Sequence, residues 1–169
     1  MKIGICFGSY SPFHKVHLQI IEKASHENEI VMVMISLNDR KRLNEFPICS
    51  KEKALLWKEH YQHIMPSNVK LHYTFDSPIK KVFEIINKLK EQNLKDEITI
   101  YGGDNLHEIF SGIEDVVKLA HIQRDGTSGT LMREFLQKQN KKEFIKLLPD
   151  NVNGESIYEI LLSGNKSIE

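Results

Sequence analysis

Short apolar runs alternate along this chain with longer segments in which apolar residues recur at helical spacing. The run 30–35 (Ile-Val-Met-Val-Met-Ile) is apolar at every position, which is typical of a strand covered on both faces of a sheet. Strands and helices that alternate in this way form βαβ units around a parallel sheet. The pattern therefore predicts an α/β fold with a doubly wound sheet of about five parallel strands.

The same periodicities locate the individual elements. Strands are expected at residues 2–7, 29–36, 69–74, 97–101 and 116–122. Helices are expected at residues 17–25, 50–64, 78–92, 106–110, 130–139, 141–148 and 155–162. Ser50 and Ser77 stand where helix N-caps are preferred, and Pro78 suits a first helical position. We expect a Rossmann-like domain at residues 1–150, followed by a C-terminal helix and a flexible tail at 151–169.

The charge balance restricts the partners that this chain can have. Its 169 residues include 23 Lys and Arg against 23 Asp and Glu, and general nucleic-acid binders need an excess of cations. No apolar run approaches the roughly 20 residues that cross a bilayer, and the N-terminus reads as a strand rather than a signal peptide. The two cysteines, Cys6 and Cys49, suggest no disulfide framework. We expect a soluble, cytoplasmic protein with no nucleic-acid or membrane partner.

In open parallel sheets, ligands bind beyond the carboxyl ends of the strands, where the strand order reverses. Four segments follow such ends here: the loop after the first strand and residues 38–46, 102–105 and 125–129. All four contain residue types that suit a phosphorylated ligand, so we expect the functional site to draw on them.

The loop after the first strand contains a glycine and two histidines. Gly8 removes the Cβ where the backbone turns or approaches a ligand. His14 and His17 bracket the start of the next helix, whose free N–H groups form an anion site. Two imidazoles there could donate hydrogen bonds to phosphate oxygens. Alternatively, the histidines belong to a zinc site or are ordinary surface or core residues.

The loop after the fifth strand suits an anion as well. Thr127, Ser128 and Thr130 can all cap a helix, and Gly129 frees the backbone to approach an anion. Arg133 falls about one turn into the following helix, so its guanidinium can return to the helix N-terminus and grip phosphate oxygens. The alternative is a plain helix cap followed by a solvated arginine.

These two loops carry a family resemblance. The first resembles the G-x-F/Y-x-P-x-H-x-G-H signature of the cytidylyltransferase-like (HIGH-motif) nucleotidyltransferases. The positions in register are Gly8, Tyr10, Pro12, His14 and His17. Val16 departs from the signature, because the family has a glycine there that lets the helix N-terminus lie close to the nucleotide. The second loop, Ser128-Gly129-Thr130-x-x-Arg133, is similar to the family's S/T-x-S/T-x-x-R signature.

The two remaining loops extend the resemblance. The family places a lysine after the second strand that reaches the phosphates of both substrates; Lys41 is the expected equivalent, with Arg40 and Arg42 as alternatives. A solvated basic loop is the other interpretation. The segment Gly102-Gly103-Asp104 is similar to the G-x-D segment of nicotinamide mononucleotide adenylyltransferases. Asp104 could accept from a ribose hydroxyl or cap the helix at 106–110.

The resemblance implies transfer of a nucleotidyl group, with adenylyl favoured, from ATP or CTP to a phosphorylated acceptor such as nicotinamide mononucleotide. Pyrophosphate is released, and NAD biosynthesis is the implied context. Mg²⁺ would be carried by the triphosphate, so no protein metal site is expected. Catalytic roles are implied for His14, His17, Lys41 and Arg133. Nucleotide contacts are implied for Phe7, Gly8, Ser9, Tyr10, Gly102, Gly103, Asp104, Thr127, Ser128, Gly129 and Thr130.

Several alternatives stay open within and beyond the family. Cytidylyl transfer to a phosphorylated alcohol and adenylyl transfer to phosphopantetheine are the nearest. A non-catalytic nucleotide-binding module is the alternative from another class. A class I aminoacyl-tRNA synthetase shares the histidine signature, but this chain is too short for one. Family members commonly assemble, so we expect a homo-oligomer.

Overall fold

The computed structural model describes residues 1–93, 95–123 and 128–166, with the side chains of residues 165 and 166 left out. The chain forms two compact units. The sheet unit comprises Met1–Gly8, Gln19–Ser36 and Pro66–Asp125. The helical unit comprises Ser9–Leu18, Leu37–Met65 and Gly126–Glu169. The division of the chain at residue 150 stays a prediction.

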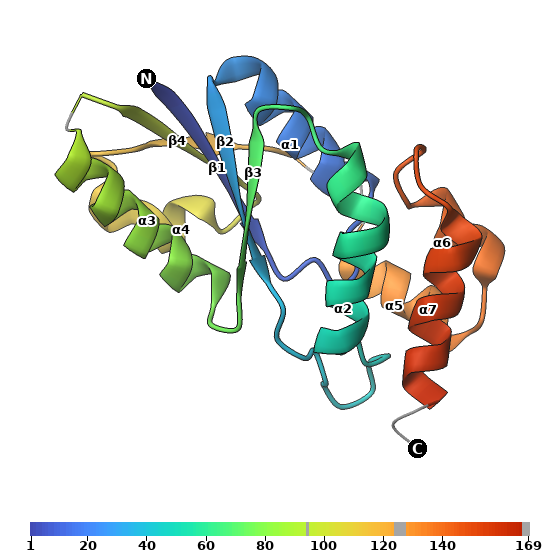
Figure 1. The fold of residues 1–169 in the computed structure, drawn as a ribbon. Coiled ribbons are helices and arrows are strands. Elements are labelled where there is room, and N and C mark those ends of the chain that lie inside the picture. The colour runs from blue at the N-terminus through green and yellow to red at the C-terminus, as the bar shows by residue number, and fades with distance from the viewer. Residues whose placement is uncertain (94, 124–127, 167–169) are drawn as a thin grey trace. The chain divides into compact units, whose positions relative to one another are not determined.

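A sheet of five parallel strands forms the centre of the sheet unit (Figure 1). The strands are β1 (Lys2–Gly8), β2 (Ile30–Ser36), β3 (Val69–Thr74), β4 (Glu97–Gly102) and β5 (Lys118–His121). Their order is β3-β2-β1-β4-β5, so the order reverses between β1 and β4. The predicted doubly wound, Rossmann-like α/β fold is confirmed. The fifth strand lies at the edge of the sheet and is shorter than the predicted 116–122, although the backbone N of Ile122 still donates to the backbone O of Gly102 at 2.8 Å.

The apolar core of the sheet unit lies between one face of the sheet and two helices, α3 (Pro78–Gln92) and α4 (Leu106–Phe110). Short η3 (Ser111–Ile113) follows α4 directly. Side chains of a strand alternate between faces, and Ile3 and Ile5 of β1 join the cluster that contains Ile86 of α3. Burial of this face removes apolar surface from water and is the main stabilisation of the unit.

The opposite face of β1 allows a close approach of backbone and side chain. A Cβ on Gly4 would lie 2.7 Å from Asn28 Nδ2, so this position has room only for glycine unless Asn28 moves. Asn28 follows α1 (Lys15–Glu27), and its amide donates to Tyr101 Oη at 2.9 Å. Tyr101 Oη in turn donates to the Glu27 carboxylate at 2.6 Å. This polar network ties the end of α1 to β4.

Local sequence explains the start of α3. Ser77 is the N-cap and accepts from the backbone N of Ile79 at 3.2 Å, while Pro78 occupies the first turn. Val82 and Ile86 are the buried residues of the helix, four positions apart on one face. The predicted bounds of this helix, 78–92, are confirmed.

The helical unit contains short helices and the loops that follow β1 and β2. Its elements are α2 (Ser50–Leu56), η1 (Trp57–Tyr61), η2 (Gln62–Ile64), α5 (Gly129–Gln137), α6 (Lys141–Lys146) and α7 (Gly154–Lys166). Helix α1 begins in this unit and continues in the sheet unit. Helix α7 packs against α2, α5 and α6, and Figure 1 shows α5, α6 and α7 as neighbours.

The single helix predicted at 50–64 was wrong in detail. It forms an α-helix, a π-helical turn at Trp57–Tyr61 and a 3₁₀ turn. Ser50 is the first helical residue rather than the N-cap, which is Cys49. The backbone N of Ser50 donates instead to Asp39 Oδ1 at 2.6 Å, so a neighbouring loop supplies the cap that Ser50 was expected to supply. Helix α7 extends beyond the predicted end at residue 162.

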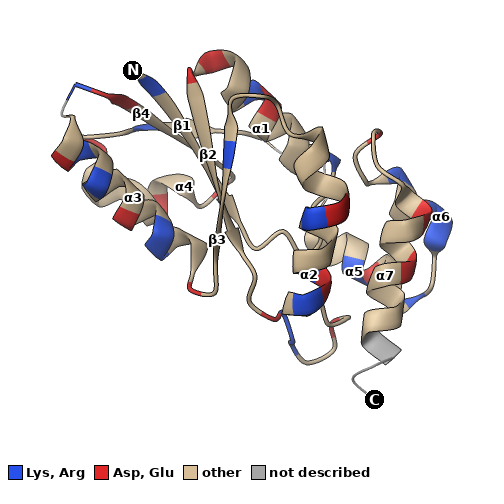
Figure 2. Cartoon of the chain, viewed as in Figure 1, with Lys and Arg blue, Asp and Glu red and all other residues tan. Residues whose placement is uncertain are grey.

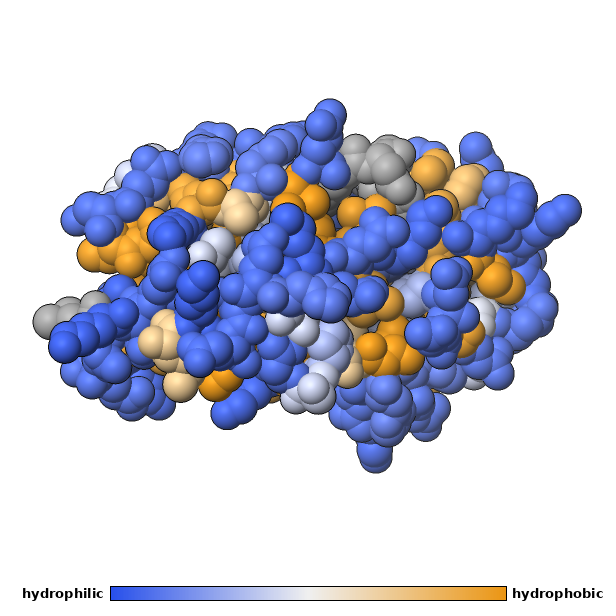
Figure 3. Space-filling view, turned by 90° about the horizontal axis from the view of Figure 1, so that it is seen from above, coloured by the Kyte–Doolittle hydropathy of each residue, from blue (hydrophilic) through white to orange (hydrophobic). Residues whose placement is uncertain are grey.

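The exposed surface is polar and mixed in charge. Figure 2 marks both acidic and basic residues along α3, and hydrophilic residues cover most of the face in Figure 3, with hydrophobic residues between them. Within the described residues, none of the helices has the length and apolar character needed to cross a bilayer.

Ile86→Ala tests the contribution of the sheet-unit core to stability. Ile86 is 3% exposed and belongs to the apolar cluster, so truncation leaves a cavity and lowers the free energy of unfolding by about 2–5 kcal/mol. The exposed neighbour Asn87 is the control, and Asn87→Ala changes the free energy of unfolding by about 0.5 kcal/mol or less. Urea unfolding of the two variants measures both values. Equal losses would contradict this account of the core.

Candidate nucleotide site

A buried aromatic cluster in the helical unit fixes the loop that follows β1. The Phe13 ring lies 5.0 Å from both Trp57 and Tyr61, and the Tyr10 ring lies 5.6 Å from Trp57. All four side chains are buried. Tyr10 has φ 48°, a left-handed conformation that is uncommon for a residue with a Cβ. Packing of its ring against Trp57 stabilises this conformation, so the aromatic cluster determines the shape of the loop.

The two histidines of the signature are stacked. Their ring centroids are 3.6 Å apart, with His14 fully buried and His17 half-buried. The backbone N of His14 donates to His17 Nδ1 at 3.1 Å. Because Nδ1 accepts, a neutral His17 carries its proton on Nε2 and presents that N–H as a donor. The arrangement orients the His17 imidazole at the start of α1, where the helix end also favours an anion.

Arg133 joins α5 to the same loop. Its side chain is 4% exposed, and Nη1 donates to the backbone O of Ser11 at 2.6 Å. Nη2 donates to Thr130 Oγ1 at 3.1 Å, and Nε lies 3.6 Å from Glu45 Oε2. Burial and the nearby Arg40 lower the pKa of Arg133, although the guanidinium stays charged at neutral pH. The predicted alternative of a solvated arginine is wrong.

The start of α5 is built for this close approach. Ser128 is the N-cap and accepts from the backbone N of Leu131 at 3.1 Å, as predicted. A Cβ on Gly129 would lie 2.8 Å from Arg133 Nη1 and 3.2 Å from the backbone O of Ser11. Glycine at this position therefore lets the guanidinium and the loop meet. Thr127 lies outside the described residues.

The loop after β2 separates its three cations. Arg40 pairs with Ile48 through two backbone hydrogen bonds, and its Nε lies 3.4 Å from Glu45 Oε2. Glu45 is thus shared by Arg40 and Arg133. Lys41 is exposed and lies 3.7 Å from the Asp39 carboxylate, and Arg42 is exposed. The structure brings Arg40 to Arg133, whereas the role predicted for Lys41 stays a prediction.

Lys53 is a second buried cation that the sequence patterns did not single out as functional. It is 3% exposed, and its Nζ donates to the backbone O of Asn38 at 2.8 Å and to Ser9 Oγ at 3.4 Å. Ser9 Oγ lies 2.6 Å from Ser11 Oγ, next to the carbonyl that Arg133 binds. Burial lowers the pKa of Lys53 to about 8. A signal did exist: Lys53, Leu56 and Trp57 have the spacing of a buried helical face.

The other predicted nucleotide residues lie in the sheet unit. Phe7 and Gly8 end β1, directly before Ser9. Gly102 ends β4, and Gly103 and Asp104 follow it. The Asp104 carboxylate is 98% exposed and lies 3.0 Å from His121 Nε2. Asp104 does not cap α4, because Asn105 is the N-cap residue of that helix. Its predicted contact with a ribose stays a prediction.

The chemistry of the helical-unit residues suits a polyanion. Hydrogen-bond donors surround the loop after β1. They belong to the stacked histidines, Arg133, Lys53 and hydroxyl groups. Among the described residues, no group of three or more His, Cys, Asp or Glu could hold a metal ion.

Comparison with known proteins shows the family of this chain. A family model described as cytidylyltransferase-like matches residues 5–146. The phosphopantetheine adenylyltransferase of Mycoplasma capricolum is 30% identical over 137 residues, covering 80% of this chain and 96% of the relative. That of Mycoplasma mycoides is 28% identical over 138 residues, with the same coverage.

A solved structure shares the fold. Plasmodium falciparum nicotinic acid mononucleotide adenylyltransferase, complexed with NaAD, superposes with a TM-score of 0.64 at 17% identity. The match covers 97% of this chain and 96% of the other. The family model spans most of the chain and includes both signature loops. The chain therefore belongs to the cytidylyltransferase-like family of nucleotidyltransferases.

Proposed function

We propose that this enzyme transfers the adenylyl group of ATP to the phosphate of a small acceptor, with nicotinamide mononucleotide as the first candidate. The observation that carries the proposal is the buried Arg133 guanidinium bonded to the loop that bears His14 and His17. This contact joins the two signature loops on which phosphate binding depends. The relatives at 28–30% identity are adenylyltransferases by name, which supports ATP as the donor.

In the proposed reaction, an ionised oxygen of the acceptor phosphate attacks the α-phosphorus of ATP in line with the leaving group. A new P–O bond forms to the acceptor, the bond from the α-phosphorus to the bridging oxygen breaks, and pyrophosphate leaves with the electron pair. The nucleophile is already ionised, so no side chain needs to act as a base. Catalysis then consists of positioning and stabilising charge on the phosphate oxygens.

The residues divide this work. His17 Nε2–H donates to an α-phosphate oxygen, and His14 supports it through the stacked ring and its backbone N. Ser128, Thr130 and Arg133 bind the β- and γ-phosphates from the N-terminus of α5. Lys41 lies on the exposed part of its loop, and its ammonium group would stabilise the negative charge between the acceptor phosphate and the leaving pyrophosphate.

Further proposed nucleotide contacts come from Ser9 and Tyr10 in the loop after β1. Contacts with the nucleoside are assigned to Phe7, Gly8, Gly102, Gly103 and Asp104. The predicted contact of Thr127 is also part of the proposal. Mg²⁺ bound to the triphosphate would neutralise charge on its oxygens. We also propose that the enzyme works in the cytoplasm and assembles as a homo-oligomer.

Phosphopantetheine is the second candidate acceptor. It is favoured by the names of the two relatives, which this chain matches over 96% of their length. Nicotinamide mononucleotide is favoured by the resemblance of Gly102-Gly103-Asp104 to the G-x-D segment of its adenylyltransferases. Both candidates present a phosphate monoester, so the phosphate chemistry of the site is the same for either.

A pyrophosphate-release assay identifies the reaction. ATP and CTP are each tested, with Mg²⁺, against nicotinamide mononucleotide, phosphopantetheine, glycerol phosphate and phosphocholine. We expect release with ATP and nicotinamide mononucleotide. If pyrophosphate is released only with phosphopantetheine, then phosphopantetheine is the acceptor in place of nicotinamide mononucleotide. If it is released only with CTP, the proposed adenylyl transfer is wrong. Binding of ATP with no release from any acceptor would favour a non-catalytic module.

His17→Ala tests the proposed imidazole donor. Loss of one oriented donor to the transferred phosphate lowers kcat by about 10²–10³-fold. His26→Ala is the matched control, because His26 is an exposed histidine in the last turn of the same helix. Steady-state kinetics with circular dichroism separate activity from folding. A folded His17→Ala enzyme with most of its activity would refute the role of His17.

Gly129→Ala tests the approach of Arg133 to the loop. The added methyl group would lie 2.8 Å from Arg133 Nη1 and 3.2 Å from the backbone O of Ser11, so the guanidinium moves and the loop shifts by a few tenths of an ångström. Loss of one charged hydrogen-bonding arrangement weakens ATP binding by about tenfold or more. Gly112→Ala is the control, because a Cβ there has nothing within 4 Å. Calorimetric titration measures the affinities, and equal values for both variants would contradict the arrangement.

A further inference from the structure

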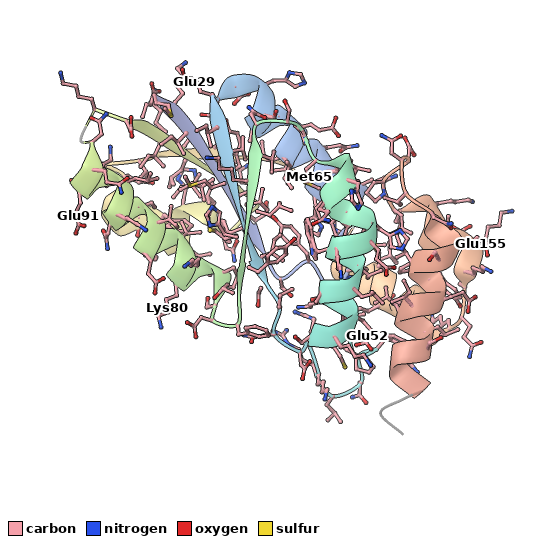
Figure 4. All side chains as sticks on the ribbon, in the orientation of Figure 1. Glu29, Glu52, Met65, Lys80, Glu91 and Glu155 are labelled. Carbon is pink, nitrogen blue, oxygen red and sulfur yellow. The ribbon has the colours of Figure 1, made fainter. Side chains whose placement is uncertain are left out.

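Lys53 stands on the buried face of α2, in a position where an apolar residue is expected. Lys53 and Leu56 are the buried residues of this helix, and buried Trp57 follows directly. Figure 4 labels the preceding residue, Glu52, on α2. Burying an ammonium group costs free energy unless it gains strong partners, so a lysine here needs an explanation beyond packing.

The contacts of Lys53 lead to the phosphate site. Its Nζ donates to the backbone O of Asn38 after β2 and to Ser9 Oγ after β1. Ser9 Oγ lies 2.6 Å from Ser11 Oγ, and the backbone O of Ser11 accepts from Arg133. Two buried cations from two different helices thus hold one three-residue stretch of loop. All of these residues belong to the helical unit.

We propose that Lys53 is a positioning residue of the phosphate site, whose buried ammonium group fixes the Ser9–Ser11 stretch and is held in its charged form when a nucleoside triphosphate binds. This inference rests on the proposed function, because it takes the triphosphate of the donor nucleotide as the anion. It adds to that function a residue outside both signatures and a coupling between nucleotide binding and protonation.

The coupling follows from the charges that face Lys53. Burial lowers its pKa most, and Arg40 and Arg133 lower it further. Asp39 and Cys49 act in the opposite direction, and the resulting pKa is about 8. A triphosphate near this ammonium group favours its charged form and raises the pKa. ATP therefore binds more tightly to the protonated enzyme, and binding near pH 8 takes up a proton.

The size of this effect follows from the pKa of the free enzyme. At pH 8 Lys53 is about half deprotonated, so binding of ATP takes up as much as about half a proton. If only the ammonium form binds, ATP affinity falls about tenfold between pH 7 and pH 9. If Lys53 had a purely structural role, ATP binding would take up almost no proton through Lys53, and ATP affinity would be nearly the same at pH 7 and pH 9.

In the unliganded chain, the pKa of Lys53 makes the free energy of unfolding depend on pH in the direction opposite to ATP affinity. The folded-state pKa lies below the ordinary value of 10.5, so burial destabilises the fold wherever both states are protonated, which is below about pH 8. Between about pH 8 and 10.5 the unfolded chain binds more protons than the folded chain, so stability rises with pH. The cost of burying Lys53 therefore falls over the same pH range in which ATP binding weakens.

Calorimetric titration of the full chain with ATP at pH 7, 8 and 9, in two buffers of different ionisation enthalpy, tests the proposal. For the wild type we expect proton uptake that rises from pH 7 to pH 9, together with the loss of affinity given above. Lys53→Arg keeps its charge over this range, so its affinity stays constant. Lys53→Met binds weakly at every pH. Lys51→Met, at an exposed position of the same helix, behaves as the wild type.

Each outcome decides the proposal. Wild-type binding without proton uptake, or the same pH dependence in Lys53→Arg, overturns it even where pyrophosphate release shows that the enzyme is active. Proton uptake by a chain that releases no pyrophosphate from any acceptor supports the role of Lys53 and overturns the proposed transfer. A wild type that binds no ATP overturns both. If the Lys53 variants do not fold, the wild-type proton count alone decides.

Discussion

The hydrogen bond from Arg133 to the backbone O of Ser11 is the contact on which the site depends. It joins residues 122 positions apart in the sequence, and both of its ends are buried. A buried guanidinium is tolerated when it has polar and charged partners, and here Thr130 Oγ1 accepts a second hydrogen bond while the Glu45 carboxylate lies 3.6 Å from Nε as an ion pair. Gly129 and the Ser128 cap are arranged so that this bond can form. The shape of the loop after β1 thus depends on α5 as much as on its own sequence.

The parallel fold was predictable because its signals are local. The apolar run of β2 predicts a strand from a few neighbouring residues, and the Ser77-Pro78 pair predicts the start of α3 in the same way. The break in the helix at Trp57 was not predictable in this way. There the large rings of Trp57 and Tyr61 must both reach Phe13, and a π-helical turn brings them to it. Tertiary packing overrides helical propensity at this point.

The signature residues of the site were predictable, but their partners were not. His14, His17 and Arg133 stand in recognisable patterns, and the structure brings Arg133 to the histidine loop. Glu45 and Lys53 belong to no pattern, because their roles arise only when Arg40, Arg133 and Ser9 come together in space. The sequence does carry one trace of Lys53, a charge at an apolar position of a helix. The sequence alone does not distinguish the three cations after β2. In the structure, the backbone of Arg40 pairs with Ile48 and its side chain lies next to Glu45.

The central claim is that the loop after β1, held by Arg133, is where the triphosphate binds. A crystal structure of the chain with a non-hydrolysable ATP analogue tests it directly. We expect phosphate oxygens within hydrogen-bonding distance, about 2.7–3.2 Å, of His17 Nε2 and of the Arg133 guanidinium. An analogue whose triphosphate lies elsewhere, with both of these groups free of phosphate, would contradict it.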